Sequence, residues 1–195
     1  MCRASNNITA FGVLMSLNTG IRIGELLGLT WKNVDFEDGS IYIEQAVARR
    51  KDFDAEEGAN KTRVEILPTK TTNSTRTVPM SDELIKELLE YRDKQEFLHG
   101  RLPEYVISNN LGGIMEPRNY TRFFYILVKR AGLGHKNYHT TRHTFATRWM
   151  QRGLDVLTLS KILGHAHTST TQNRYGHVLE EHKKSKMKVM GQYHV

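Results

Sequence analysis

The chain has 195 residues, of which 38% are hydrophobic and 25% are charged, a balance that suits one soluble globular domain with a real core. The single cysteine, Cys2, excludes an internal disulfide, and no apolar run reaches membrane-spanning length. Residues 1–119 carry 15 Lys/Arg and 18 Asp/Glu, whereas residues 120–195 carry 13 and 3, so the net charge of +7 comes from the C-terminal part. Such a basic part is typical of nucleic-acid binders, although a solvated basic surface gives the same count.

The N-terminal part of the chain predicts two helices followed by a strand. The apolar stretch ITAFGVLMSLNTG (8–20) favours a helix that ends at the Asn-Thr-Gly sequence, and IRIGELLGLTW (21–31) favours a second, short helix. A turn at 37–40 then leads into a strand at 41–47, which is rich in β-forming residues.

The middle of the chain predicts a loop, two more strands and a helix. The charged segment 48–62 has no apolar period and is expected to be a loop, whereas 62–70 and 75–79 have strand composition. Ser81 is a predicted N-cap, because acidic residues follow it in the first turn of an amphipathic stretch. A short strand is expected at 105–108.

Helices are predicted to dominate the rest of the chain, at about 117–131, 140–152, 155–163 and 168–177. The fold class is therefore expected to be α+β, mainly helical with a small three-stranded antiparallel sheet. The N-terminus MCRASNNITAF shows no signal peptide, so a cytoplasmic location without membrane attachment is expected.

Several polar side chains are predicted at the ends of these elements, where they can converge on a ligand without entering a core. They are Arg22, Lys70, His139, Arg142, His165 and Tyr175.

These residue types fit the transesterification of a phosphodiester. Two arginines can each place a bidentate fork on phosphate oxygens and neutralise the charge of a pentacoordinate transition state. A phenol becomes a useful nucleophile when a base takes its proton or nearby cations stabilise the phenolate. Lysine or histidine can supply a proton to the leaving alkoxide.

Four stretches carry a resemblance to the tyrosine recombinases, the phage-integrase family, and in particular to integrases of phages and conjugative transposons. These stretches are TGIRIGEL (19–26), TKTTNSTRTVP (69–79), HTTRHTFAT (139–147) and LGHAHTSTTQNRYGH (163–177). Each motif alone is a weak signal, but the four occur in the family's order, and the similarity spans roughly residues 8–178.

The resemblance implies roles for the six residues. Arg22 and Arg142 would form the catalytic arginine pair, and Lys70 would be the acid on a strand-to-strand turn. Tyr175 would be the nucleophile, and the two histidines, His139 and His165, would be phosphate or proton partners. Attack on DNA would leave a 3′-phosphotyrosyl link and a free 5′-hydroxyl that reseals the strand, so neither a metal, ATP nor another cofactor would be required.

The resemblance also implies partners and domain organisation. The substrate would be double-stranded DNA, bound by a homotetramer on paired sites and assisted by accessory DNA-bending proteins. Residues 1–178 would form the catalytic domain, and 179–195 a tail that docks on a neighbouring protomer, packs on its own domain or is disordered. The core-binding and arm-binding domains of full-length members are expected to be absent from this chain.

Other residues invite a second interpretation. His139 and His143 stand four apart on one helix and could bind zinc, but no HExxH glutamate accompanies them and Arg142 would repel a cation. His143 is instead expected to be a capping or core residue, and Glu25 an orienting partner. The predicted contacts to the DNA backbone are Arg148, Arg152, Arg174 and Lys161, with Lys129 and Arg130 as further candidates.

Two alternative functions stay open at the level of sequence. A type IB topoisomerase-like enzyme would use the same chemistry to relax supercoils without exchanging partners. A catalytically inert DNA-binding regulator would use the segment around 154–175 as a helix-turn-helix, but it would have no need for the arginines, lysine and tyrosine together.

Overall fold

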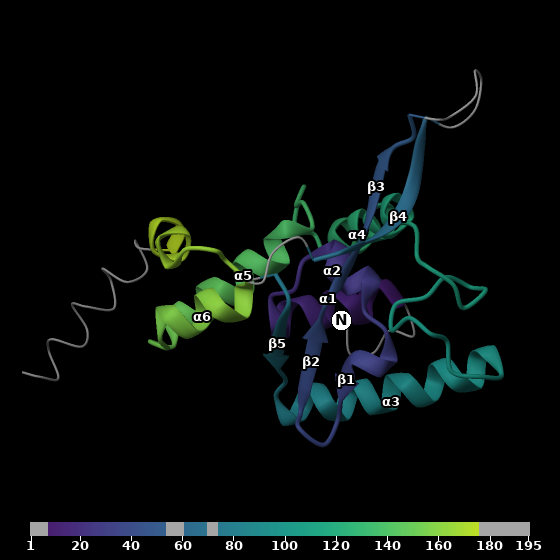
Figure 1. Cartoon of the computed structure of the whole chain (residues 1–195), viewed down its shortest axis with the longest axis horizontal. Coiled ribbons are helices and arrows are strands. Elements are labelled where there is room, and N and C mark those ends of the chain that lie inside the picture. Colours follow the sequence, from purple (N-terminus) through teal and green to yellow (C-terminus); the bar gives the residue numbers. More distant parts are fainter. Residues whose placement is uncertain (1–7, 54–60, 70–73, 176–195) are drawn as a thin grey trace, which may run out of the picture.

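The computed structural model describes residues 8–53, 61–69 and 74–175. Within this part of the chain, helices pack beside a small three-stranded sheet, and a two-stranded ribbon extends away from them (Figure 1). Lys70 and the predicted tail 179–195 lie outside the described residues. No helix in the described ranges has both the length and the apolar character that a membrane crossing demands.

The helix α1 (Ile8–Thr19) runs through the centre of the molecule. Most of its side chains are buried on all sides, which is why its sequence is apolar without a marked polar face. It packs against α4 (Pro117–Arg130) and α5 (His139–Gln151). The hydroxyl of Tyr138, just before α5, lies 2.8 Å from Ser16 Oγ and donates to the carbonyl of Gly12 at 3.1 Å, so α1 is fixed to the start of α5.

The remaining helices lie around this centre. The helix α2 (Ile23–Gly28) and a 3-10 turn, η1 (Trp31–Asn33), follow α1. The long helix α3 (Asp82–His99) begins at Ser81, whose side chain accepts a hydrogen bond from the Leu84 amide, as the sequence predicts. The helix α6 (Val156–Leu163) begins at Asp155, whose carboxylate accepts from the Leu157 and Thr158 amides. A further helical segment covers residues 168–175.

The three-stranded sheet differs in membership from the predicted one. Its strands are β1 (Val34–Asp35), β2 (Ser40–Ile43) and β5 (Arg76–Pro79), with β2 antiparallel to both neighbours. The predicted strand 41–47 is broken at Glu44, and its second half continues as β3 (Gln45–Lys51). The expectation that 48–62 is entirely a loop was therefore wrong for residues 48–51.

The strands β3 and β4 (Thr62–Pro68) form the projecting ribbon. They pair antiparallel over their whole length, from Gln45 opposite Pro68 to Lys51 opposite Thr62. Residues 105–108, predicted as a strand, contribute only isolated bridges, one from Tyr105 to Thr30 and one from Ser108 to Ile114.

Candidate active site

The site forms where four separate segments meet: the junction of α1 and α2, the first turn of α5, the end of α6, and the helical segment 168–175. In Figure 1 the helices α5 and α6 lie side by side. Five of the six predicted residues belong to these segments, namely Arg22, His139, Arg142, His165 and Tyr175. The sixth, Lys70, lies outside the described residues.

Arg142 is the most deeply buried charge of the site, with 2% of its surface exposed. Its Nη1 donates to the carbonyl of Gly20 at 2.9 Å and its Nη2 to the carbonyl of Leu163 at 2.5 Å. Burial, followed by the charge of Arg22, lowers the pKa of Arg142 to about 9, so the guanidinium stays protonated at pH 7. Because carbonyls hold it, its positive charge is not cancelled by a direct carboxylate partner.

Arg22 is half-exposed and is held by Glu25, three residues further on. The Arg22 Nη1 donates to Glu25 Oε1 at 2.7 Å, and the Arg22 amide donates to Oε2 at 2.8 Å, which also caps the start of α2. The Arg22 Nη2 lies 3.4 Å from the carbonyl of Gly164, next to the Leu163 carbonyl that binds Arg142. The two guanidinium groups thus share one end of α6.

A buried ion pair supports Glu25 from the opposite side. Arg76, at the start of β5, donates to both Glu25 oxygens at 3.0 and 2.9 Å and through Nε to the Ile162 carbonyl at 2.6 Å. Burial alone would raise the pKa of Glu25, but Arg76 and Arg22 outweigh it and lower the pKa to about 2. Glu25 is therefore an orienting partner, as predicted, and Arg76 is a supporting residue that its sequence motif does not indicate.

Gly20 allows the chain to turn sharply between α1 and Arg22. Its φ of +68° lies in the left-handed region, and a Cβ there would collide with Phe145 and Leu163 side chains. This close packing sets the Gly20 carbonyl against Arg142, so the glycine positions both arginines.

His165 follows the left-handed Gly164 that ends α6, and its Nδ1 lies 2.8 Å from Thr171 Oγ1. Burial first, and then the charges of Arg142 and Arg22, lower the pKa of His165 to about 4. The imidazole is therefore neutral at pH 7, able both to accept and to donate a hydrogen bond.

The two histidines of α5 stack edge to face, with ring centroids 4.7 Å apart. Burial lowers the pKa of both His139 and His143, and nearby arginines, Arg142 and Arg174, lower it further. In the described part of the chain no group of three or more His, Cys, Asp or Glu side chains is arranged to hold a metal ion.

Tyr175 occupies a more buried place than its polar sequence neighbours suggest. Only 3% of its surface is exposed, and its ring packs in an apolar cluster made by Ala146, Met150, Leu159 and Leu163. Its hydroxyl lies 2.9 Å from Nδ1 of His143. The expectation that His143 is only a capping or core residue was therefore wrong, because it contacts the predicted nucleophile.

Burial raises the pKa of Tyr175, and the charges of Arg142 and Arg174 oppose that rise. The phenol is thus protonated at rest, in a field that stabilises a phenolate once the proton has a destination. The junction thus combines two arginines, neutral histidines and a phenol. These groups can bind an anion, exchange protons with it and supply a nucleophile.

The four predicted backbone contacts lie at the surface of the molecule, on or directly after α5, on α6 and in the segment 168–175. Arg148, Arg152, Lys161 and Arg174 are all exposed. The charge of Arg174 acts on the site. It adds to the lowering of the pKa of His139, His143 and His165, and it opposes the rise in the pKa of Tyr175.

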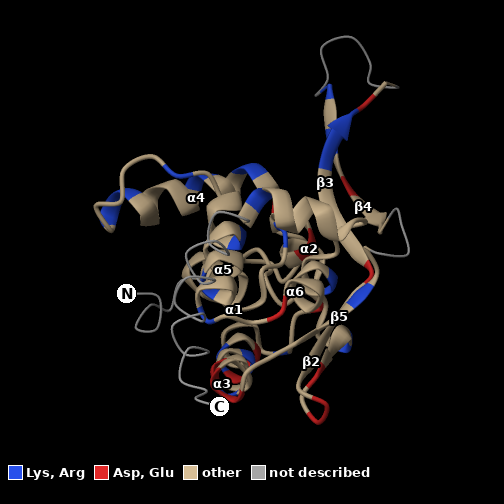
Figure 2. Ribbon diagram, turned by 90° about the vertical axis from the view of Figure 1, so that its left-hand side faces the viewer, with Lys and Arg blue, Asp and Glu red and all other residues tan. Residues whose placement is uncertain are grey.

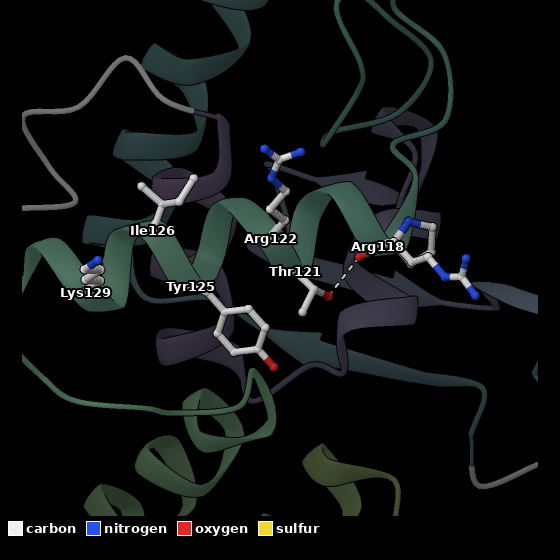
Figure 3. A pocket seen from close by; sticks show the side chains of 7 residues that line it. Arg118, Thr121, Arg122, Tyr125, Ile126 and Lys129 are labelled. Carbon is white, nitrogen blue, oxygen red and sulfur yellow. Dashed lines mark hydrogen bonds between the residues drawn. The ribbon is translucent and has the colours of Figure 1, made fainter.

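A second basic surface lies on α4 and was only partly foreseen. The side chains of Arg118, Arg122, Tyr125, Ile126 and Lys129 line a shallow pocket along one exposed face of the helix (Figure 3), which we call the α4 surface. The opposite face is buried through Tyr120, Phe124 and Val128. Lys129 was a predicted contact, and the spacing of basic residues at 118, 122 and 129 is the signal that places the others on its face.

The model of the phage integrase family matches residues 3–182. A XerC-like tyrosine recombinase of Caldanaerobacter subterraneus is 34% identical over 179 residues, which cover 87% of this chain and 46% of that protein. The transposase of transposon Tn916 from Enterococcus faecalis is 30% identical over 187 residues, covering 90% of this chain and 44% of the relative. The chain thus spans about half the length of these relatives.

Solved structures show the same fold. The integrase of transposon Tn1549, solved in complex with transposon right end DNA, superposes with a TM-score of 0.73 at 24% identity, covering 94% of this chain and 59% of that one. The XerA recombinase gives a TM-score of 0.68 at 25% identity, covering 99% and 61%. With its fold, its motifs and these similarities, the chain belongs to the phage integrase family, the tyrosine recombinases.

Proposed function

We propose that the chain is the catalytic part of a site-specific DNA recombinase that integrates or excises a mobile element. Tyr175 attacks the scissile phosphate, the O–P bond forms, and the P–O5′ bond breaks to give a 3′-phosphotyrosyl link and a 5′-hydroxyl. A 5′-hydroxyl from the partner strand then reverses the step and reseals the DNA. The observation that carries the proposal is the buried Tyr175 hydroxyl, hydrogen-bonded to His143 and acted on by the charge of Arg142, whose guanidinium is held by backbone carbonyls.

The other residues have roles that follow from their surroundings. Arg22 and Arg142, which meet at the end of α6, bind the non-bridging oxygens and offset the charge of the transition state. The neutral His139 and His165 hydrogen-bond the phosphate or exchange protons with it. Lys70, on the β4–β5 connection, supplies the proton to the leaving 5′ oxygen, a role that rests on its motif alone.

We further propose that double-stranded DNA lies across the exposed cations around the site and the α4 surface. Figure 2 shows Lys and Arg spread over α4 and α5, whereas Asp and Glu gather on α3. A duplex is a dense line of negative charge, so it is attracted to the first of these faces and repelled by the second.

Strand exchange between two duplexes needs four cleavages, so we propose a homotetramer on paired sites, with accessory DNA-bending proteins aiding its assembly. Residues 1–178 would act as the catalytic domain and 179–195 as a segment that couples neighbouring protomers. Analytical centrifugation of the chain with paired-site DNA tests this, because a complex that never exceeds one protomer per duplex would contradict it.

The decisive test is trapping of the covalent link. The DNA ends joined to the protein in cells are sequenced to find its site, and a nicked duplex carrying that site is incubated with the chain. We expect a stable adduct on Tyr175 that Tyr175→Phe abolishes without weakening DNA binding. An adduct that persists in the phenylalanine variant would contradict the proposal, and relaxation of supercoils on arbitrary DNA by single chains would indicate a topoisomerase instead.

A further inference from the structure

Within residues 8–53, 61–69 and 74–175, the side chain that hydrogen-bonds to the Tyr175 hydroxyl is that of His143. The Nδ1 of His143 lies 2.9 Å from the Tyr175 hydroxyl, and the two rings are tilted by 61° at a centroid distance of 6.0 Å. Because the Tyr175 ring is held in the apolar cluster of α5 and α6, its hydroxyl is fixed against this nitrogen. His139, which the family resemblance favours as a proton partner, touches His143 instead.

We infer that His143 is a further catalytic residue: it accepts the phenolic proton of Tyr175 when the tyrosine attacks DNA. This inference rests on the proposed function. In the step, the proton moves from Oη of Tyr175 to Nδ1 of His143 as the Oη–P bond forms, and the P–O5′ bond breaks toward a separate proton donor. On resealing, the 5′ oxygen displaces Oη, and His143 returns the proton.

The charges around His143 suit this role. Burial, Arg174 and Arg142 lower the pKa of His143, so the free imidazole is neutral and keeps a lone pair for the phenol. A bound phosphate brings negative charge that offsets the field of these arginines. The imidazolium then becomes easier to form, so proton uptake is favoured when a substrate is in place.

Two substitutions separate proton transfer from positioning. In His143→Asn the side-chain amide reaches the place of Nδ1 and can still hydrogen-bond the phenol, but it takes up no proton. His143→Ala removes both abilities. We expect single-turnover cleavage of the nicked site to fall about 100-fold or more in both, with DNA binding unchanged and with added imidazole restoring part of the rate of His143→Ala. His99→Asn, at the end of α3, is the matched control and is expected to cleave like the unsubstituted chain.

A change of leaving group separates the role of His143, as the base for Tyr175, from that of Lys70, as the proposed acid for the 5′ oxygen. A substrate with sulfur in place of the bridging 5′ oxygen has a leaving group that needs no proton. This substrate is therefore expected to restore the cleavage rate of Lys70→Ala but not that of His143→Asn. The acid limb of the unsubstituted chain's pH–rate profile should include a step below pH 6.5, from protonation of His143, whose pKa is lowered by burial, Arg174 and Arg142 and whose ring contacts that of His139. That step should vanish in His143→Asn.

The outcomes can be told apart. If the unsubstituted chain forms no adduct with its site, the proposed function and this inference both fail. If it forms the adduct and His143→Asn cleaves at the same rate, or is restored by the sulfur substrate, the inference alone is overturned.

Discussion

Individual charged residues of the site are stabilised in two different ways. Arg22 and Arg76 share the carboxylate of Glu25, so three charges form one network that connects α2 with β5. Arg142 instead has carbonyl partners and keeps its full charge for a ligand. Within this network Glu25 has a structural role, because the residue is 4% exposed and both of its carboxylate oxygens accept hydrogen bonds.

We expect Glu25→Gln to lower the free energy of unfolding by about 3 kcal/mol at pH 7, from the shift of its pKa from 4.5 to about 2. The substitution also leaves Arg76 buried without its carboxylate. Because the folded pKa lies below the unfolded one, the stabilisation is complete above pH 4.5 and disappears as the pH falls through about 2. Urea unfolding between pH 2 and 7 measures this.

Asp93→Asn is the control for that substitution. Asp93 is 72% exposed and lies 3.7 Å from Arg92, so the change should cost less than about 1 kcal/mol. Equal losses in the free energy of unfolding for Glu25→Gln and Asp93→Asn would show that the buried network stabilises the fold no more than an exposed ion pair does.

At the level of elements, the end of α1 helps to set the positions of Arg22 and Arg142. The Gly20 amide donates to the Ser16 carbonyl at 3.0 Å and closes the helix, and the chain then turns directly into Arg22. The α5 and α6 side chains Phe145 and Leu163 press against this turn. A shift here would therefore move the Gly20 carbonyl away from Arg142.

Gly20→Ala and Gly132→Ala form a matched pair. Both glycines have a φ of +68°, but a Cβ at Gly132 meets nothing within 4 Å, whereas one at Gly20 overlaps Phe145 and lies 2.9 Å from Leu163. Backbone strain alone should cost about 1 kcal/mol at Gly132, and overpacking should add about 1–3 kcal/mol at Gly20. Thermal unfolding of the two variants checks the difference, and a Gly20 variant as stable as the Gly132 variant would contradict the packing argument.

At the level of the whole molecule, charge is divided between two faces. The acidic helix α3 lies away from α4 and α5, whose exposed charged residues are all Lys or Arg (Figure 2). This division gives an approaching duplex one preferred face.

Replacing Arg118, Arg122 and Lys129 by Ala tests that division. If all three contact phosphates, the slope of log K against log salt should become shallower by about 2.7. The charge-matched control is Lys86, Lys94 and Arg101 replaced by Ala, since these exposed residues lie in or just after α3. Equal effects of the two triple substitutions, measured by fluorescence anisotropy between 50 and about 200 mM salt, would place DNA elsewhere.

The helices could largely be predicted from the sequence, and the strand pairing could not. The stretches 8–20, 117–131, 140–152 and 155–163 were predicted as helices from local composition and spacing, and they form α1, α4, α5 and α6. The strands share similar composition, and the break at Glu44 that separates β2 from β3 has no signal in propensity. Partners in a sheet are chosen by long-range packing, which a local pattern does not contain.

The site was predicted as a set of residues but not as a set of contacts. The motifs identified Arg22, Arg142 and Tyr175, and the structure brings their segments together. The contact between Tyr175 and His143 spans 32 positions, and that between Arg76 and Glu25 spans 51, so neither has a sequence spacing that would indicate it. Both depend on which helix faces become buried.

The two groups that accept hydrogen bonds from Arg142 are carbonyl oxygens of the peptide backbone, which every amino acid supplies alike. Exchanging the side chain at 163 for another apolar one leaves the carbonyl oxygen there unaltered. Mutational drift at that position therefore preserves the hydrogen bond from Arg142. A change in the path of the chain, at the bend after α1 or the last turn of α6, would be needed to break the hydrogen bonds of Arg142.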